Sequence, residues 1–277
     1  MNILLCTPLY SQHFDAGHFW LKALNELGQS VIVWDYRLDS TARSIDQINV
    51  PDATLVLKGE GINPNALPRP RFCYWPDAFF RDPGIEERLR LYDKVFTPVR
   101  PMPDWMEWLP TSFDEDIHRN LQIPRTVKTI YIGTNNSDYK REMVMSLYLS
   151  AVHGNGWGQF KDNVVGPVYL HDFVKAANQA KILIDIHHDP RYGLNRKFFE
   201  MIACGFTLVD RVPGAADILG PDLADRVTFT TTEEARKLIA YYLIHPEERE
   251  SLWSQQRKAI QPYSYLKAAK KILRYLK

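Results

Sequence analysis

The chain has 277 residues, of which 45% are hydrophobic and 12% aromatic, so it can fill the cores of two domains and is too apolar to be disordered. Its 34 basic and 33 acidic residues give a net charge of +1, which excludes a global attraction to nucleic acid or membrane and leaves only local patches open. The three cysteines lie far apart and form no Cys-x-x-Cys pair, so we expect buried free thiols rather than a zinc site.

No targeting or membrane segment is evident. No apolar run approaches the ~20 residues of a membrane span. The residues after Met1 become polar too soon for a signal peptide. We therefore expect a cytoplasmic protein without a membrane span, present as a monomer or a weak dimer.

The amino half alternates short apolar runs with one strong helical pattern. The helix is predicted from Asp15 to about Leu27, between the first two apolar runs, and this order predicts a right-handed βαβ unit of a parallel sheet. The predicted strands are residues 2–6, 31–34, 54–58, 72–75 and 94–97.

Three residues of this half follow predicted strands, at the edge where open α/β sheets bind ligands. Gly17 and His18 lie where the first loop enters its helix, and His18 can act as a base on an acceptor or contact a donor sugar. Asp77 leaves the fourth strand and can orient a sugar hydroxyl. The alternatives are a structural histidine and an Asx turn that closes the strand.

The strand pattern restarts after Ile123-Pro124, which predicts a first domain over residues 1–122 and a second over 123–261. A final helix is expected within 262–277. The predicted strands of the second domain are 129–132, 182–186, 206–209 and 227–229, and its main helices are 139–149, 171–180, 195–204 and 233–243.

Two predicted helix starts of the second domain can bind an anion, because helix N-termini present N–H groups and partial positive charge. The first follows Gly133 and Thr134 and carries Lys140 and Arg141. Its alternative interpretation is a solvated basic helix face.

The second helix start lies in the stretch from His187 to Asp210, around which we expect the chain to be organised. Arg196 and Lys197 open the helix, and Glu200 lies one turn later, where a carboxylate can accept hydrogen bonds from a ribose diol. Gly205 is expected to be a left-handed C-terminal cap. The alternative is an amphipathic helix with a solvated charged edge.

A metal site is not favoured at Asp185, His187, His188 and Asp189. Adjacent histidines on an extended chain point to opposite faces. No divalent cation or other cofactor is therefore expected.

Taken together and in this order, these segments resemble those of the GT-B glycosyltransferases, and within them the spore-maturation-type group. The resemblance is carried by IYIGTNNSDYKRE (130–142), ILIDIHH (182–188) and NRKFFEMIACG (195–205), the last of which is similar to the signature N-x-R-x-F-E-x-x-A-C-G. It implies an α/β fold of two Rossmann-like domains with parallel sheets facing across a cleft, and a final helix within 262–277 that returns to the first domain.

The same resemblance implies transfer of a sugar from a nucleotide diphosphate sugar, with uridine favoured, to an acceptor hydroxyl. Glu200 would bind the ribose, and Arg196 would stabilise the leaving diphosphate without a metal ion. His18 and Asp77 complete the catalytic set. The implied donor-binding residues are Gly17, Gly133, Thr134, Lys140, Arg141, Pro167, Val168, Tyr169, Tyr192, Gly193, Leu194, Asn195, Arg196 and Glu200.

Tyr192 departs from the family pattern, because retaining members often carry a second Glu at that position. The stereochemical outcome stays open, with retention favoured. The acceptor is also open among glycans, proteins, lipids and modified nucleic-acid bases. A sugar-nucleotide epimerase or hydrolase and a non-catalytic sugar-nucleotide-binding protein are the alternative functions.

Overall fold

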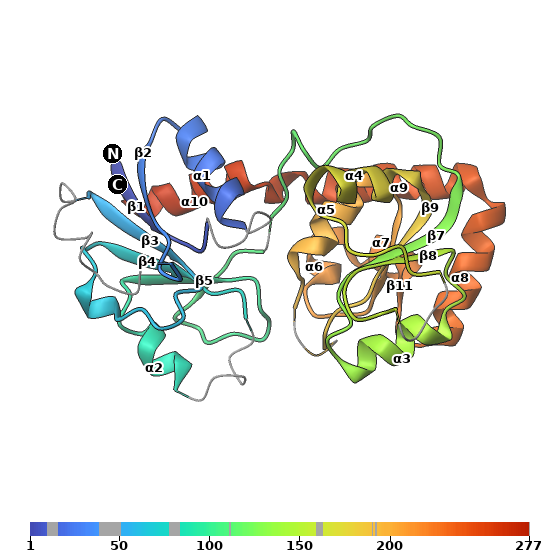
Figure 1. Ribbon diagram of the computed structural model, residues 1–277, viewed down its shortest axis with the longest axis horizontal. Helices are drawn as coiled ribbons and strands as arrows, with labels where there is room; N and C mark the ends of the chain where they lie inside the picture. The colour runs from blue at the N-terminus through green and yellow to red at the C-terminus, as the bar shows by residue number, and fades with distance from the viewer. Residues whose placement is uncertain are drawn as a thin grey trace. The chain divides into compact units, whose positions relative to one another are not determined.

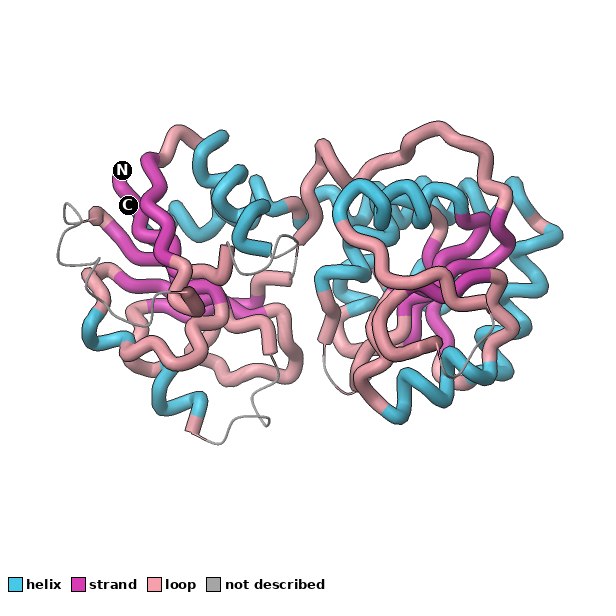
Figure 2. The backbone as a smooth tube through the Cα atoms, viewed as in Figure 1, coloured by secondary structure: helices cyan, strands magenta, loops and turns pink. Residues whose placement is uncertain are grey.

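The computed structural model describes residues 1–9, 16–38, 51–77, 84–110, 112–158, 163–189, 191 and 193–276. These residues form two compact units, each built on a parallel sheet. Unit 1 contains residues 1–111 and 265–277, and unit 2 contains residues 112–264. Figure 2 shows strands at the centre of each unit and helices outside them. The predicted α/β class is confirmed, and residues 112–122 are grouped with unit 2 rather than with unit 1.

Unit 1 has a six-stranded sheet of order β2-β1-β3-β4-β5-β6, in which every pairing is parallel. Most of β3 to β5 is buried, and most of their residues are apolar, as expected for strands inside a parallel sheet. The strands are β1 (Asn2–Cys6), β2 (Ser30–Trp34), β3 (Ala53–Leu57), β4 (Arg71–Tyr74), β5 (Lys94–Thr97) and β6 (Glu107–Trp108). The helices are α1 (Ala16–Glu26), α2 (Ile85–Leu89) and α10 (Tyr265–Leu273).

The last helix, α10, packs beside α1 at the opposite end of the sequence (Figure 1). The ring of Tyr265 stacks on Phe19 with centroids 5.1 Å apart and meets the edge of Trp20 at 5.7 Å. Lys271 donates to the carbonyl of Trp108 at 3.2 Å. The carboxyl-terminal residues therefore complete the core of unit 1.

Unit 2 has a five-stranded parallel sheet of order β11-β10-β9-β7-β8. Helices α4, α5 and α9 lie on one side of it and α3 on the other (Figure 1). The strands are β7 (Val127–Ile132), β8 (Ala151–His153), β9 (Ala180–Asp185), β10 (Thr207–Asp210) and β11 (Thr228–Phe229). The helices are α3 (Asp138–Ser146), α4 (Leu170–Gln179), α5 (Arg196–Cys204), α6 (Ala215–Leu219), α7 (Pro221–Val227), α8 (Thr232–Ile244) and α9 (Pro246–Ile260).

Strand register brings the site segments of unit 2 together. Tyr131 on β7 is the partner of Ile184 on β9, and Asp185 is the partner of Val209 on β10. Parallel strands end at the same edge, so the residues that follow β7, β9 and β10 become neighbours there. Among the described residues, no helix is both long and apolar enough to cross a membrane.

Two local predictions were wrong. The helix predicted over 139–149 ends at Ser146, since Leu147 has extended backbone. Gly205 is not a left-handed cap, because its φ is −168° and its ψ is 169°. Glycine is needed there for space instead: a Cβ would lie 2.9 Å from Nη1 of Arg125 and 3.1 Å from Cδ1 of Leu183.

A buried amide side chain fastens α9 to the start of β10. Gln256, which is fully buried, accepts a hydrogen bond from the Thr207 N–H at 3.2 Å and donates one to the Thr207 carbonyl at 2.7 Å. Both backbone groups would otherwise be buried without partners.

We predict that Gln256→Leu lowers the free energy of unfolding by about 2–6 kcal/mol, because two buried backbone groups lose their partners at about 1–3 kcal/mol each. Gln255→Leu, one residue earlier on the exposed face of α9, is the control and should change it by less than about 0.5 kcal/mol. Urea denaturation followed by circular dichroism measures both. Equal effects of the two substitutions would contradict this role.

Candidate functional site

The candidate site lies at the carboxyl edge of the unit 2 sheet, where α3 and α5 begin. Each helix start is capped by a side chain: Ser137 accepts from the N–H of Lys140 at 3.2 Å, and Asn195 accepts from the N–H of Phe198 at 3.1 Å. Both starts present the positive end of a helix dipole to the same edge. The two helix starts predicted from the sequence are therefore real helix N-termini.

The turn between β7 and α3 is held closely against the chain that follows β8. Trp157 donates from its indole nitrogen to the Gly133 carbonyl at 2.6 Å. Gly154, at φ +140°, approaches so closely that a Cβ would lie 2.1 Å from that carbonyl oxygen. Only glycine fits at residue 154, and the turn at Gly133 is fixed as a result.

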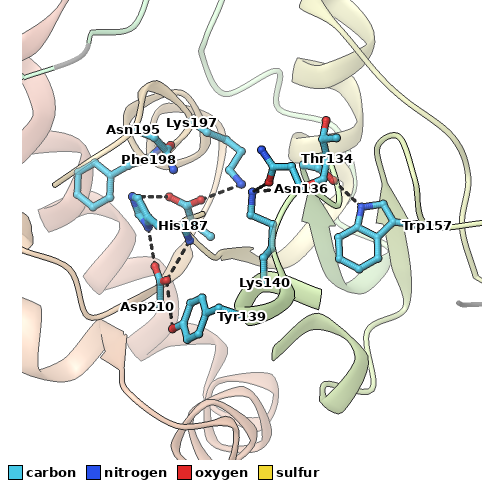
Figure 3. A network of polar contacts seen from close by, with 12 residues as sticks. Thr134, Asn136, Tyr139, Lys140, Trp157, His187, Asn195, Lys197, Phe198 and Asp210 are labelled. Carbon is cyan, nitrogen blue, oxygen red and sulfur yellow. Dashed lines mark hydrogen bonds and ion pairs between the residues drawn. The ribbon is translucent and has the colours of Figure 1, made fainter. Parts of the chain in front are cut away.

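Lys140 bends back over this turn. Its ammonium donates to the Asn136 side-chain oxygen at 2.7 Å and to the Thr134 carbonyl at 3.4 Å, and the residue is only 6% exposed (Figure 3). A cation is thus built into the turn rather than left on the helix surface. Of the two basic residues predicted here, Lys140 is the one that joins the site.

Arg141 points elsewhere. Its guanidinium pairs with Asp138 on the same helix, and its side chain is 37% exposed. Arg141 therefore lies on a solvated helix face, which was the alternative interpretation of this position from the sequence.

Lys197 brings a second ammonium to the same turn from the start of α5. Its Nζ lies 3.0 Å from Oδ1 of Asp185 and 4.8 Å from the ring centroid of Tyr131. A Cβ on Gly133 would lie 2.9 Å from this Nζ and 2.5 Å from the Tyr131 hydroxyl. The glycine therefore leaves the space in which the ammonium sits.

The Lys197–Asp185 pair is deeply buried, since Asp185 has no exposed side-chain surface and Lys197 only 17%. Burial opposes the charged form of both groups. Nevertheless, Tyr131 and Asp185 hold the pKa of Lys197 above its usual value, and Lys197 and His187 hold the pKa of Asp185 below its own. Burial also raises the pKa of Tyr131 to about 12, so this hydroxyl stays protonated at neutral pH.

Asp210, at the end of β10, extends this network toward α3. Its Oδ1 lies 2.5 Å from Nδ1 of His187, and its Oδ2 accepts from the His187 N–H at 2.9 Å and from the Tyr139 hydroxyl at 3.4 Å (Figure 3). Nε2 of His187 lies 3.8 Å from Oδ2 of Asp185. The loop after β9 is thereby joined to both helix starts.

Arg196 and Glu200 form a second cluster on α5. Oε1 of Glu200 lies 2.8 Å from Nε of Arg196 and 3.5 Å from Nε2 of His118, and Glu200 is 5% exposed. Burial lowers the pKa of His118 although Glu200 acts in the opposite direction. Nδ1 of His118 lies 3.1 Å from the backbone nitrogen and 3.2 Å from the carbonyl oxygen of Asp114, and Nε2 faces Glu200.

The remaining predicted donor residues of unit 2 lie on two loops. Val168 packs against the core, Pro167 is exposed, and the hydroxyl of Tyr169 contacts the Asn155 amide at 3.2 Å. Gly193 is partly exposed and Leu194 is buried just before the Asn195 cap. Tyr192 lies outside the described residues.

The predicted residues of unit 1 lie near the carboxyl edge of its own sheet. Gly17 touches the end of β1 so closely that a Cβ would lie 2.5 Å from Oγ1 of Thr7. Nε2 of His18 is buried, with no hydrogen-bond partner among the described residues. Asp77 pairs with Lys58 at 2.9 Å, and Lys58 also pairs with Glu60 at 3.0 Å.

No group of three or more His, Cys, Asp or Glu side chains among the described residues converges as cation ligands do, and Asp185 and His187 are instead engaged with Lys197 and Asp210. A pocket of about 360 Å³ lies between residues 116–123 and α4, and its lining does not include Gly133, Lys140 or Lys197.

Sequence reasoning did not assign several residues to the site. It did not predict that Lys197 faces the Gly133 turn, and it did not predict the residues that hold the site's charged groups in place: His118, Tyr139, Asp185, His187 and Asp210. One signal was available. In NRKFFE the arginine position of the N-x-R-x-F-E signature falls on Lys197, not on Arg196. His118 lies 82 residues before Glu200, and no local pattern connects the two.

Known structures match the whole chain. HepE of Anabaena, solved with UDP and glucose, has a TM-score of 0.71 at 11% identity and covers 100% of this chain and 99% of its own. The β-glucosyltransferase of phage T4 has a TM-score of 0.66 at 16% identity, with the same coverage. A DNA-modifying β-glucosyltransferase, studied with and without uridine diphosphoglucose, has a TM-score of 0.69, 16% identity and the same coverage. This chain has the GT-B fold.

A comparison of sequences matches the part of the chain that contains most of the site. Residues 141–274 match a family model described as glycosyl transferase-like. The matched range contains four residues of the site: Asp185, His187, Lys197 and Glu200. No curated protein matches the chain. The fold predicted from the sequence is confirmed, whereas the spore-maturation-type subgroup is not shown.

We predict that Lys197→Met lowers the free energy of unfolding by about 3 kcal/mol, because it leaves the carboxylate of Asp185 buried without its cation. Arg141→Met, which removes a basic side chain from the exposed face of α3, should cost less than about 0.5 kcal/mol. Chemical denaturation at pH 7 measures both variants. A small loss for Lys197→Met would show that the ammonium does not neutralise Asp185.

Proposed function

We propose that the chain is a glycosyltransferase that takes a hexose from a UDP-sugar. The observation that carries the proposal is the meeting of two buried ammonium groups, Lys140 and Lys197, with two capped helix starts at the Gly133 turn. A diphosphate matches this arrangement, because helix N-termini and lysines both favour its charge. The glycosyl transferase-like match to residues 141–274 and the UDP and UDP-glucose complexes of HepE support this assignment.

The rest of the donor site follows from the neighbouring side chains. The diphosphate would lie against Gly133, Thr134 and the Asn195 cap. Glu200 would accept from the ribose hydroxyls, because Arg196 and His118 already hold its carboxylate in place. Pro167, Val168 and Tyr169 would border the base.

The chemical step needs charge stabilisation at the leaving diphosphate. The ammonium groups of Lys140 and Lys197 are held before the donor arrives, so little reorganisation is required as charge develops. Arg196, 31% exposed and paired with Glu200, can add a third cation. These residues would carry the role that a divalent cation has in other transferases.

The acceptor side is assigned to unit 1. Asp77 is proposed to accept the proton of the acceptor hydroxyl, with Lys58 fixing its carboxylate. His18, whose Nε2 has no described hydrogen-bond partner, and Gly17 would border the reacting sugar. The DNA-modifying neighbour makes a hydroxylated nucleic-acid base one acceptor to test, beside glycans, proteins and lipids.

We predict that UDP binds in isothermal titration calorimetry and that Lys140→Gln weakens it by about 10–100-fold. That is the loss of one hydrogen bond to a charged group, about 1.5–3 kcal/mol at 1.4 kcal/mol per factor of ten. Arg141→Gln is the matched control, because it removes the adjacent cation, and it should change the dissociation constant by less than about twofold. Absence of UDP binding, or equal effects of the two variants, would contradict the proposed site.

We also predict transfer of labelled hexose from UDP-glucose to an acceptor, with a rate that resists EDTA, because lysines rather than a cation stabilise the leaving group. The assay offers glycan, peptide, lipid and hydroxylated-DNA pools, and mass spectrometry reads the product. Proton NMR of UDP-glucose incubated without acceptor is the control. Rapid release of free glucose or of an epimer would favour a hydrolase or an epimerase, and binding without turnover would favour a sugar-nucleotide-binding protein.

A further inference from the structure

His187 lies at the centre of the polar network and is 2% exposed. Its Nδ1 faces Oδ1 of Asp210 at 2.5 Å, and its Nε2 faces Oδ2 of Asp185 at 3.8 Å. The imidazole therefore lies between two carboxylates that have no exposed side-chain surface. A neutral ring that donates to Asp210 turns a bare lone pair toward Asp185, whereas an imidazolium turns an N–H toward it; at 3.8 Å this second contact is electrostatic and not a hydrogen bond.

The charges of the groups nearest the ring balance when the ring is protonated. Asp185 and Asp210 supply two negative charges, and Lys197 supplies one positive charge at 3.0 Å from Asp185. Without a charge on His187, the carboxylates would exceed the nearest ammonium by one charge in a dry environment, where such an excess is costly. Lys140 adds a weaker influence on Asp185 from α3.

The ring also connects the two helix starts that would bind the donor. Tyr139 on α3 contacts Asp210 at 3.4 Å, Asp210 contacts His187 through both oxygens, and Asp185 joins His187 to Lys197 on α5. Figure 3 labels four residues of this network: Tyr139, Asp210, His187 and Lys197. His187 thus lies behind the proposed diphosphate site, in contact with the residues that shape it.

We propose that protonated His187 is a positioning residue for the donor diphosphate: by neutralising Asp185 and Asp210 it holds Lys197 and the starts of α3 and α5 in their binding arrangement. This inference rests on the proposed function of the same site. His187 itself does not touch the donor. Loss of its proton would leave excess negative charge beside the diphosphate and would draw Lys197 more strongly toward Asp185.

The groups that face the ring determine the direction of its pH dependence. These are Asp185 on β9, Asp210 on β10, Lys197 on α5, Tyr139 on α3 and, beyond Lys197, Tyr131 on β7. Burial lowers the pKa of His187, but Asp210 and Asp185 outweigh it and raise that pKa above the usual 6.5. The stabilising interaction is complete below 6.5 and is lost as the pH rises through the raised pKa.

The test measures UDP-glucose affinity by calorimetry from pH 6 to 9, for the wild type, His187→Gln and the control His245→Gln, which removes a histidine at the junction of α8 and α9. UDP-glucose is the probe because its diphosphate has no proton that titrates in this range. Imidazole ¹⁵N NMR of the ligand-free protein, with the His187 signal assigned by its absence from His187→Gln, reports when the ring loses its proton.

We expect the wild-type dissociation constant to rise about tenfold across the pH at which His187 deprotonates, and His245→Gln to behave identically. His187→Gln should bind about tenfold more weakly at pH 6 and show no rise. If His187→Gln does not fold, the His187 signal is assigned by triple-resonance NMR of the wild type instead, and disagreement between the wild-type midpoints from calorimetry and NMR overturns the inference.

The test distinguishes failure of this inference from failure of the proposed function. Wild-type affinity that stays constant while His187 deprotonates, or full affinity in His187→Gln, overturns this inference and leaves the proposed function standing. No binding of UDP-glucose or UDP at any pH overturns the proposed function and this inference with it.

Discussion

The buried ion pair of Lys197 and Asp185 is the interaction on which the candidate site depends. A lysine ammonium is costly to remove from water, so its position at the Gly133 turn requires the carboxylate that lies 3.0 Å away. The turn in turn requires glycine, because a Cβ at residue 133 would collide with the ammonium and with the Tyr131 hydroxyl. The charge pair and the glycine therefore join the start of α5 to the ends of β7 and β9, which strand pairing already holds side by side.

Glu200 is a second site residue whose orientation depends on residues far away in the sequence. Its carboxylate is directed by Arg196 one turn earlier and by His118 from the segment that precedes β7. His118 is fixed by the backbone of Asp114, and Asn178 on α4 anchors the same segment through the Leu121 N–H and the Arg119 carbonyl. Residues 112–122 therefore belong to unit 2 for a physical reason: they complete the surroundings of a buried carboxylate on α5.

The two units differ in how clearly their ionisable residues indicate a function. Unit 2 concentrates paired, buried ionisable residues at one sheet edge. The pKa values of Asp185, His187 and Lys197 are shifted there, which is typical of functional sites. Unit 1 offers a more exposed cluster of Lys58, Glu60 and Asp77. Diphosphate recognition needs fixed charges, whereas an acceptor surface varies with its substrate, and this difference explains why the donor class is better defined than the acceptor.

The sequence by itself determined the fold class, most strand positions and the two helix starts, because apolar periodicity, caps and turn glycines are local properties of the chain. It also singled out Lys140 and Glu200. Only the tertiary structure decided that Lys197 rather than Arg196 faces the turn, that Arg141 lies on the exposed face of α3, and that Asp185, His187 and Asp210 form one network. These outcomes depend on strand register and on which neighbour neutralises a buried charge, and both bring together residues far apart in the chain, such as Gly133 with Lys197 and His118 with Glu200.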